Sequence, residues 1–82
     1  MKEAYQLAQQ GLVSLKTAIY QILEKAPEEG LRNVDIGRTL GISYGHSGKH
    51  QDHIPRTMLE IMKIEGVVVQ DEQSKKWMLS QK

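Results

Sequence analysis

The chain contains no cysteine and no phenylalanine, and only two of its 82 residues are proline. The absence of cysteine excludes disulfide bonds, thiolate metal ligands and a cysteine nucleophile. No apolar run approaches the roughly 18 residues that a membrane-spanning helix requires, and the polar start of the sequence is unlike a secretory signal. We therefore expect a soluble, cytoplasmic protein.

Neither sign of charge dominates the sequence, whose formal net charge is only +1. The hydrophobic fraction of 39% and the charged fraction of 26% are ordinary for a globular protein. A chain of this length supports one domain with a small core. We expect a single domain over residues 1–82, with residues 1–11 as an N-terminal helical extension.

Apolar side chains recur at steps of three and four in the first third of the chain, which predicts a helix over residues 3–25. The stripe consists of Tyr5, Ala8, Leu12, Leu15, Ile19, Ile22 and Ala26. Gly11 interrupts it at a cost of about 1 kcal/mol relative to alanine, so the core-packing part is expected from Leu12 to Lys25. Residues 2–10 are then an extension, a frayed end or a partner surface. The stripe has more apolar positions than one face of a three-helix core needs, which points to a homodimer contact through this helix.

A short helix is expected over residues 34–40, because Asn33 can accept a hydrogen bond from a first-turn amide. Gly41 suits the left-handed residue that ends many helices. The polar stretch 43–51 contains two glycines and no periodicity, so it is interpreted as a loop.

A second long helix is expected over residues 53–65, with Asp52 as its N-cap and Met58 and Met62 at core spacing. Two short apolar segments, "VVVQDE" and "WMLSQ", flank a polar turn, which predicts a β-hairpin. Trp77, in the second of these segments, is expected to close the core.

The pattern "LRNVDIGRTLGI", a polar stretch and then "TMLEIMKIEGVVVQDEQSKKWML" resembles winged helix-turn-helix domains over residues 12–80. The resemblance implies an α+β fold, in which a three-helix bundle carries a C-terminal two-stranded β-hairpin wing. It also implies that the helix at 53–65 lies in the major groove of double-stranded DNA, with the wing on the backbone. A small transcriptional regulator or a DNA-targeting module would act in this way. The link at 43–52 is longer than the family's tight turn, so contacts around the turn stay open.

The candidate DNA-binding side chains are cationic or polar and cluster around the third helix and the hairpin tip. They are Lys49, His50, Gln51, His53, Arg56, Thr57, Lys63, Lys75 and Lys76. Arginine pairs with guanine edges and glutamine with adenine, while lysine and histidine can contact phosphates. Residues 31–56 hold four Lys or Arg against two Asp, which favours a polyanionic partner mildly. Glu60 lies on the same side of the third helix as Arg56 and Lys63 and would repel phosphate, although it could accept a hydrogen bond from a cytosine amino group. The competing interpretation is an ordinary solvated helix face.

All three histidines lie in "GHSGKHQDH", residues 45–53. Three imidazoles and Asp52 could hold zinc, but structural zinc sites in small domains usually include cysteine. Serine, histidine and aspartate are also the residue types of a catalytic triad, but a glycine-flanked loop is poor support for one. We expect no metal site, no cofactor and no enzymatic activity. The alternative to DNA binding is a winged-helix domain that binds another protein.

Overall fold

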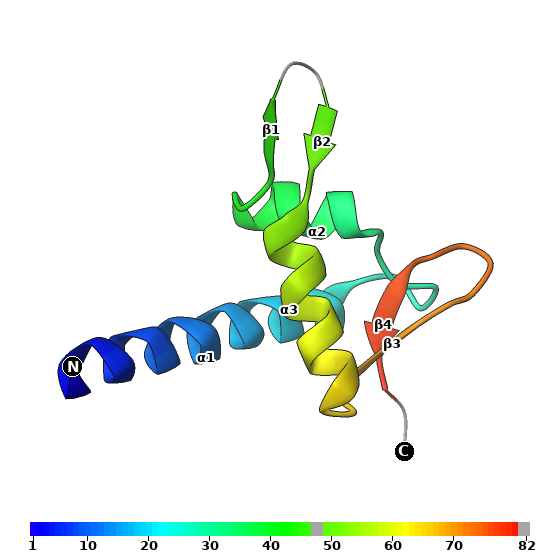
Figure 1. The fold of residues 1–82 in the computed structure, drawn as a ribbon. Coiled ribbons are helices and arrows are strands. Elements are labelled where there is room, and N and C mark those ends of the chain that lie inside the picture. The colour runs from blue at the N-terminus through cyan, green and yellow to red at the C-terminus, as the bar shows by residue number, and fades with distance from the viewer. Residues whose placement is uncertain (47–48, 81–82) are drawn as a thin grey trace.

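The described residues form three helices and two antiparallel hairpins, one hairpin between the second and third helices and one after the third (Figure 1). The computed structural model describes residues 1–46 and 49–80, and within 44–46 and 49–51 it describes the backbone alone. In chain order the elements are α1 (Lys2–Lys25), α2 (Asn33–Leu40), β1 (Tyr44–His46), β2 (Lys49–Gln51), α3 (His53–Ile64), β3 (Val68–Gln70) and β4 (Trp77–Leu79). The expected α+β class, with three helices followed by a two-stranded hairpin, is confirmed.

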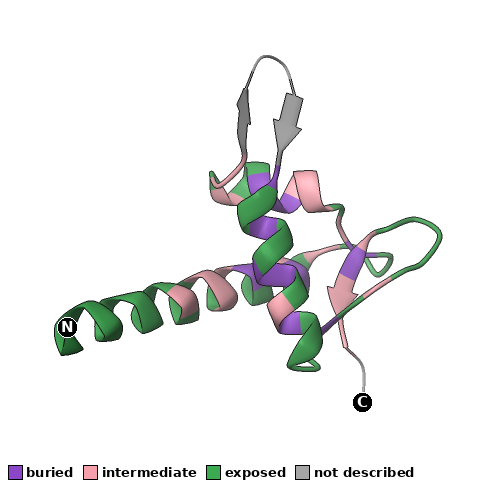
Figure 2. Cartoon of the chain, viewed as in Figure 1, coloured by how far each residue is buried: buried purple, intermediate pink, exposed green. Residues whose placement is uncertain are grey.

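Only the C-terminal half of α1 packs against the rest of the protein. Ile19 and Leu23 are buried, while Leu12 and Leu15 are partly buried against the core. Residues 1–11 are exposed without exception, and Figure 2 shows this part of the helix projecting from the body. The predicted division between a projecting segment and a core-packing segment is confirmed.

The core lies where α1, α2 and α3 meet the last hairpin. Its buried hydrophobic side chains are Ile19, Leu23, Ile36, Met58, Leu59, Met62, Val68 and Trp77. Every helix and both strands of the second hairpin contribute, because no single element is large enough to bury its own apolar face. The predicted core roles of Met58, Met62 and Trp77 are confirmed.

Two polar side chains join α2 to the start of α3 instead of capping their own helices. Asn33 is the first residue of α2, and Arg32 occupies the cap position without a side-chain hydrogen bond, so the predicted Asn33 cap is wrong. The Asn33 Nδ2 atom instead donates to the carbonyl of Asp52 at 3.1 Å. Asp52 occupies the N-cap position of α3 as predicted, but its carboxylate accepts from the Ser43 hydroxyl rather than from a helix amide. Asp52 is buried, so its partner is set by tertiary packing rather than by local geometry.

The predicted loop over residues 43–51 is wrong, because β1 and β2 form an antiparallel hairpin there. The paired residues are Tyr44 with Gln51, Gly45 with His50, and His46 with Lys49. A strand is recognised in a sequence by alternating apolar side chains. Residues 43–51 show no such alternation, and the hairpin projects beyond the N-terminal end of α3 (Figure 1).

A third segment of chain pairs beside the second hairpin. In the hairpin itself, β3 and β4 pair in the register Val68–Leu79, Val69–Met78 and Gln70–Trp77. Leu31 and Trp77 then exchange two backbone hydrogen bonds, with N···O distances of 2.9 and 2.7 Å. This bridge places the start of α2 next to the hairpin that follows α3.

Candidate nucleic-acid interface

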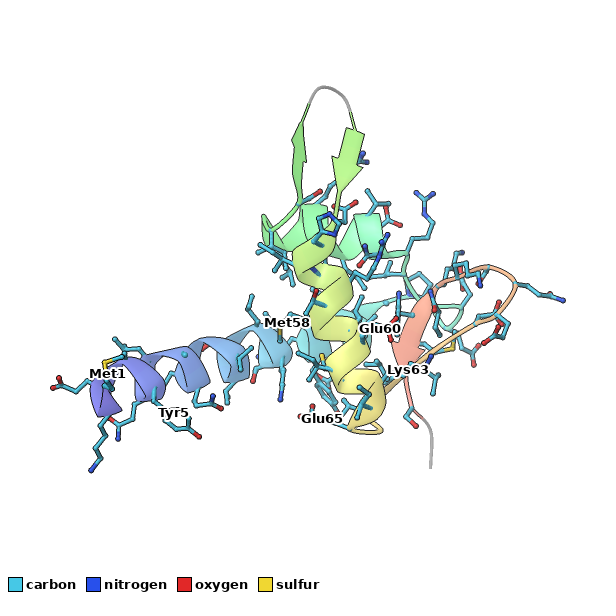
Figure 3. All side chains as sticks on the ribbon, in the orientation of Figure 1. Met1, Tyr5, Met58, Glu60, Lys63 and Glu65 are labelled. Carbon is cyan, nitrogen blue, oxygen red and sulfur yellow. The ribbon has the colours of Figure 1, made fainter. Side chains whose placement is uncertain are left out.

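One side of α3 faces solvent because the opposite side is in the core. Pro55, Met58, Leu59 and Met62 are buried at helical spacing, which leaves a polar stripe on the other side. Its exposed polar members are His53, Arg56, Thr57, Glu60 and Lys63. Figure 3 shows Glu60 and Lys63 on the side of α3 toward the β3–β4 hairpin, away from Met58.

The turn between β3 and β4 is ordered by Asp71. Its Oδ2 atom accepts from the backbone amide of Ser74 at 2.7 Å and from that of Gln73 at 3.2 Å. The bonds from the amide and hydroxyl of Ser74 hold the pKa of Asp71 below its ordinary value. The backbone of Asp71 also pairs with Lys75 and Lys76, each at 2.9 Å. The turn therefore presents these two lysines from a defined backbone, in which Lys75 adopts a left-handed φ of 65°.

A cleft of about 460 Å³ separates α3 from this turn. Its lining residues come from the start of α2, from α3 and from the hairpin: Arg32, Asn33, Val34, Asp52, Arg56, Glu60, Gln70, Ser74, Lys75 and Trp77. The side chains of Arg56 and Glu60 have no hydrogen-bond or ion-pair partner within the described part of the chain. The cleft therefore offers a cation and a carboxylate on α3, with Lys75 on the opposing turn.

Arg32 is held by a neighbour at one edge of the cleft. Its Nε atom lies 3.1 Å from Oδ2 of Asp35, one turn along α2. The hydrogen bond from Arg32 keeps the pKa of Asp35 below its ordinary value. Because both side chains are more than one third exposed, this pair contributes little to stability and serves mainly to orient the guanidinium.

The predicted DNA-binding residues do not all gather at one place. Arg56 and Lys75 line the same cleft, while Lys63 is exposed on α3 outside its lining and Lys76 is half-buried. His53 and Thr57 line a separate, shallower pocket of about 230 Å³ with Ile54 and Met58. The side chains of Lys49, His50 and Gln51 lie outside the described residues. The described candidates thus fall on α3 and on the turn of the second hairpin.

Sequence reasoning missed the cleft residues contributed by α2 and β3. Arg32, Asn33 and Gln70 line the cleft, although nothing in their local sequence distinguishes them from surface residues. The Leu31–Trp77 bridge brings them there. Asn33 also keeps a buried Oδ1 atom without a hydrogen-bond donor among the described residues, so an acceptor is present at the cleft wall.

Comparison of the chain with protein-family models, curated proteins and solved structures found no match. In residues 1–46 and 49–80, no three His, Asp or Glu side chains that the structure describes gather as metal ligands would. The side chains of His46 and His50 are outside that description. None of the described helices has the length and apolarity that crossing a bilayer requires. Function therefore has to be argued from the geometry of the cleft and of α3.

Proposed function

We propose that the chain is a DNA-binding winged helix-turn-helix module, acting as a small transcriptional regulator or a DNA-targeting domain. In this proposal α3 lies in the major groove and the β3–β4 hairpin acts as the wing on the backbone beside it. The order of elements supports it, as does the third segment that pairs with the hairpin through Leu31. In such domains the helix before the wing is the reading helix.

The dimensions and chemistry of α3 suit this role. A helix of 12 residues is about 18 Å long, and a major groove about 12 Å wide admits one helix. Its exposed side carries Arg56 and Lys63 as donors, and His53 and Thr57 near its N-terminal end. These side chains have the donor chemistry that base edges and phosphates accept.

The observation that carries the proposal is the cleft shared by α3 and the wing. Arg56 and Glu60 are one turn apart on α3, and Lys75 faces them from the ordered turn. A duplex whose major groove receives α3 brings its phosphate backbone toward that turn. Arg56 then donates to guanine O6 and N7, Glu60 accepts from a cytosine amino group, and Lys75 neutralises a phosphate.

A gel-shift experiment with a random duplex library tests the proposal directly. We expect selection of a preferred sequence at low salt, and affinity that falls steeply with added salt because counterions are released from the phosphates. No binding at low salt would reject DNA as the partner and favour the protein-binding alternative.

Two variants separate base reading from backbone contact. Arg56→Ala should lower affinity for the preferred sequence by roughly 10- to 100-fold and relax the preference at one base pair. Lys75→Asn should weaken binding to all DNA sequences alike and reduce the slope of affinity against salt by about one charge, because it removes one phosphate contact. Asparagine is chosen because it tolerates the left-handed backbone at this position. Lys2→Ala, which removes one charge at the far end of α1, is the matched control and should leave binding unchanged. Equal effects of Arg56→Ala on every sequence would contradict base reading by α3.

A further inference from the structure

The N-terminal half of α1 is helical without support from the rest of the protein. Residues 1–11 are all exposed, including Tyr5 at 67% of its surface. The packed part of α1 supplies the helix nucleus, but each further turn that no other element packs against adds little stability in water. Large apolar side chains on such a segment therefore favour a covering partner.

The exposed half continues the same apolar seam that packs into the core. We define the seam as Met1, Tyr5, Ala8, Leu12, Leu15, Ile19 and Ile22, which alternate in steps of four and three. This is the heptad spacing of helices that pack side by side. The rest of the protein buries Ile19 completely, whereas Met1 and Tyr5 are exposed at the other end of the seam. The seam is thus only half covered within one chain.

The chemistry of the uncovered half fits a second copy of itself. No charged residue occurs from Ala4 to Leu15. In a twofold interface each patch meets its own copy, so charges near the centre would repel one another, and their absence removes that cost. An uncharged patch also lacks the charge pattern that would select a different protein. Gly11 has open space around its Cα, which permits close approach of another helix.

We propose that the N-terminal half of α1 is a homodimer interface in which the α1 helices of two copies pack antiparallel. The body of each protein covers the seam from Leu12 to Ile22, with Leu12 only partly covered. A parallel pair with axes about 8–10 Å apart would bring both bodies onto the same stretch of seam. An antiparallel pair places them at opposite ends, with the twofold axis near Ala8 and Tyr5 beside Leu12 of the second copy. This proposal does not depend on DNA binding.

Sedimentation equilibrium over a range of chain concentrations tests the interface. We expect the wild-type mass to rise from one chain to two as concentration increases. Ala8→Glu, which puts two carboxylates at the axis, should raise the dimer dissociation constant by more than about 10-fold. Gln10→Glu adds the same charge on the opposite side of α1 and should leave the constant unchanged. Both sites are exposed, so circular dichroism should show that each variant stays folded.

The absence of cysteine permits a second test, of helix direction. Ala8→Cys should oxidise to a disulfide-linked dimer, because the twofold axis brings residue 8 of both copies together. A disulfide requires Cα atoms about 4.4–6.8 Å apart, and this arrangement allows that distance. Tyr5→Cys should not, because antiparallel packing separates its two copies by about 9 Å along the helix axis. A wild-type chain that stays monomeric into the high micromolar range would overturn the proposal. Efficient cross-linking of Tyr5→Cys would overturn the antiparallel arrangement.

Discussion

At the scale of single residues, Asp71 links local chemistry to the proposed contact surface. Its carboxylate accepts two backbone amides and so orders the turn that carries Lys75. The folded state favours the ionised form, since the pKa of Asp71 lies below its ordinary value of 3.8. The stabilisation is therefore fully present above that pH and is lost as the pH falls through the lower, folded pKa.

We expect the β3–β4 turn to loosen as the pH falls below about 4, seen as faster hydrogen exchange of the Ser74 amide relative to core amides. Asp71→Ala, which removes the acceptor, should show weak protection of the Ser74 amide relative to core amides already at neutral pH and little further change on acidification. Glu72→Gln alters the adjacent exposed carboxylate and serves as the control, with exchange like the wild type. A Ser74 amide that is equally protected in the wild type and in Asp71→Ala would disprove this role.

At the scale of elements, the Leu31–Trp77 bridge joins the α1–α2 connection to the β3–β4 hairpin. Gly30, just before it, has a φ of 90°, and a Cβ atom there would collide with the Trp77 carbonyl group. Gly41, which ends α2, has a similar φ of 71° but open space around it. Both glycines share the cost that a side chain would have at positive φ, and only Gly30 adds a steric collision. Comparing the same substitution at the two positions therefore separates these two costs.

We expect Gly41→Ala to lower the free energy of unfolding by about 1–2 kcal/mol, because alanine is strained at positive φ. Gly30→Ala should cost at least about 2 kcal/mol more, because it adds the collision that breaks the bridge. Urea denaturation of both variants measures the difference. Equal losses in the free energy of unfolding for the two variants would mean that the Leu31–Trp77 bridge shifts to accommodate the added Cβ atom without loss of stability.

At the scale of the whole molecule, the fold and the projecting helix are separate. All core residues lie between Leu12 and Leu79, and none lies in residues 1–10. A chain that begins at Gln10 should therefore have a free energy of unfolding within about 1 kcal/mol of that of the full chain. Urea denaturation measures it, at a low protein concentration where dimerisation contributes little. A chain that begins at Thr17 loses Leu12 and Leu15 and should be far less stable. Large destabilisation of the first truncation would show that residues 1–9 support the monomer.

The sequence predicted the elements that carry an apolar period. The bounds expected for the three helices agree with α1, α2 and α3 to within a residue or two, because their buried side chains repeat every three or four positions. The second hairpin was predicted from two short apolar segments, "VVV" and "WML", on either side of a polar turn. The β1–β2 hairpin was not, because the sequence of residues 43–51 shows no alternation of apolar and polar residues.

What the sequence determined by itself is the set of helices, the buried side of each, and the polar residues on the outer side of α3. What only the tertiary structure decided is which of those residues meet. Arg56 and Lys75 are 19 positions apart, and Arg32 is farther still, yet all three line one cleft. Local propensity and spacing act over a few residues. The cleft depends on the core and on the Leu31–Trp77 bridge, which are long-range contacts.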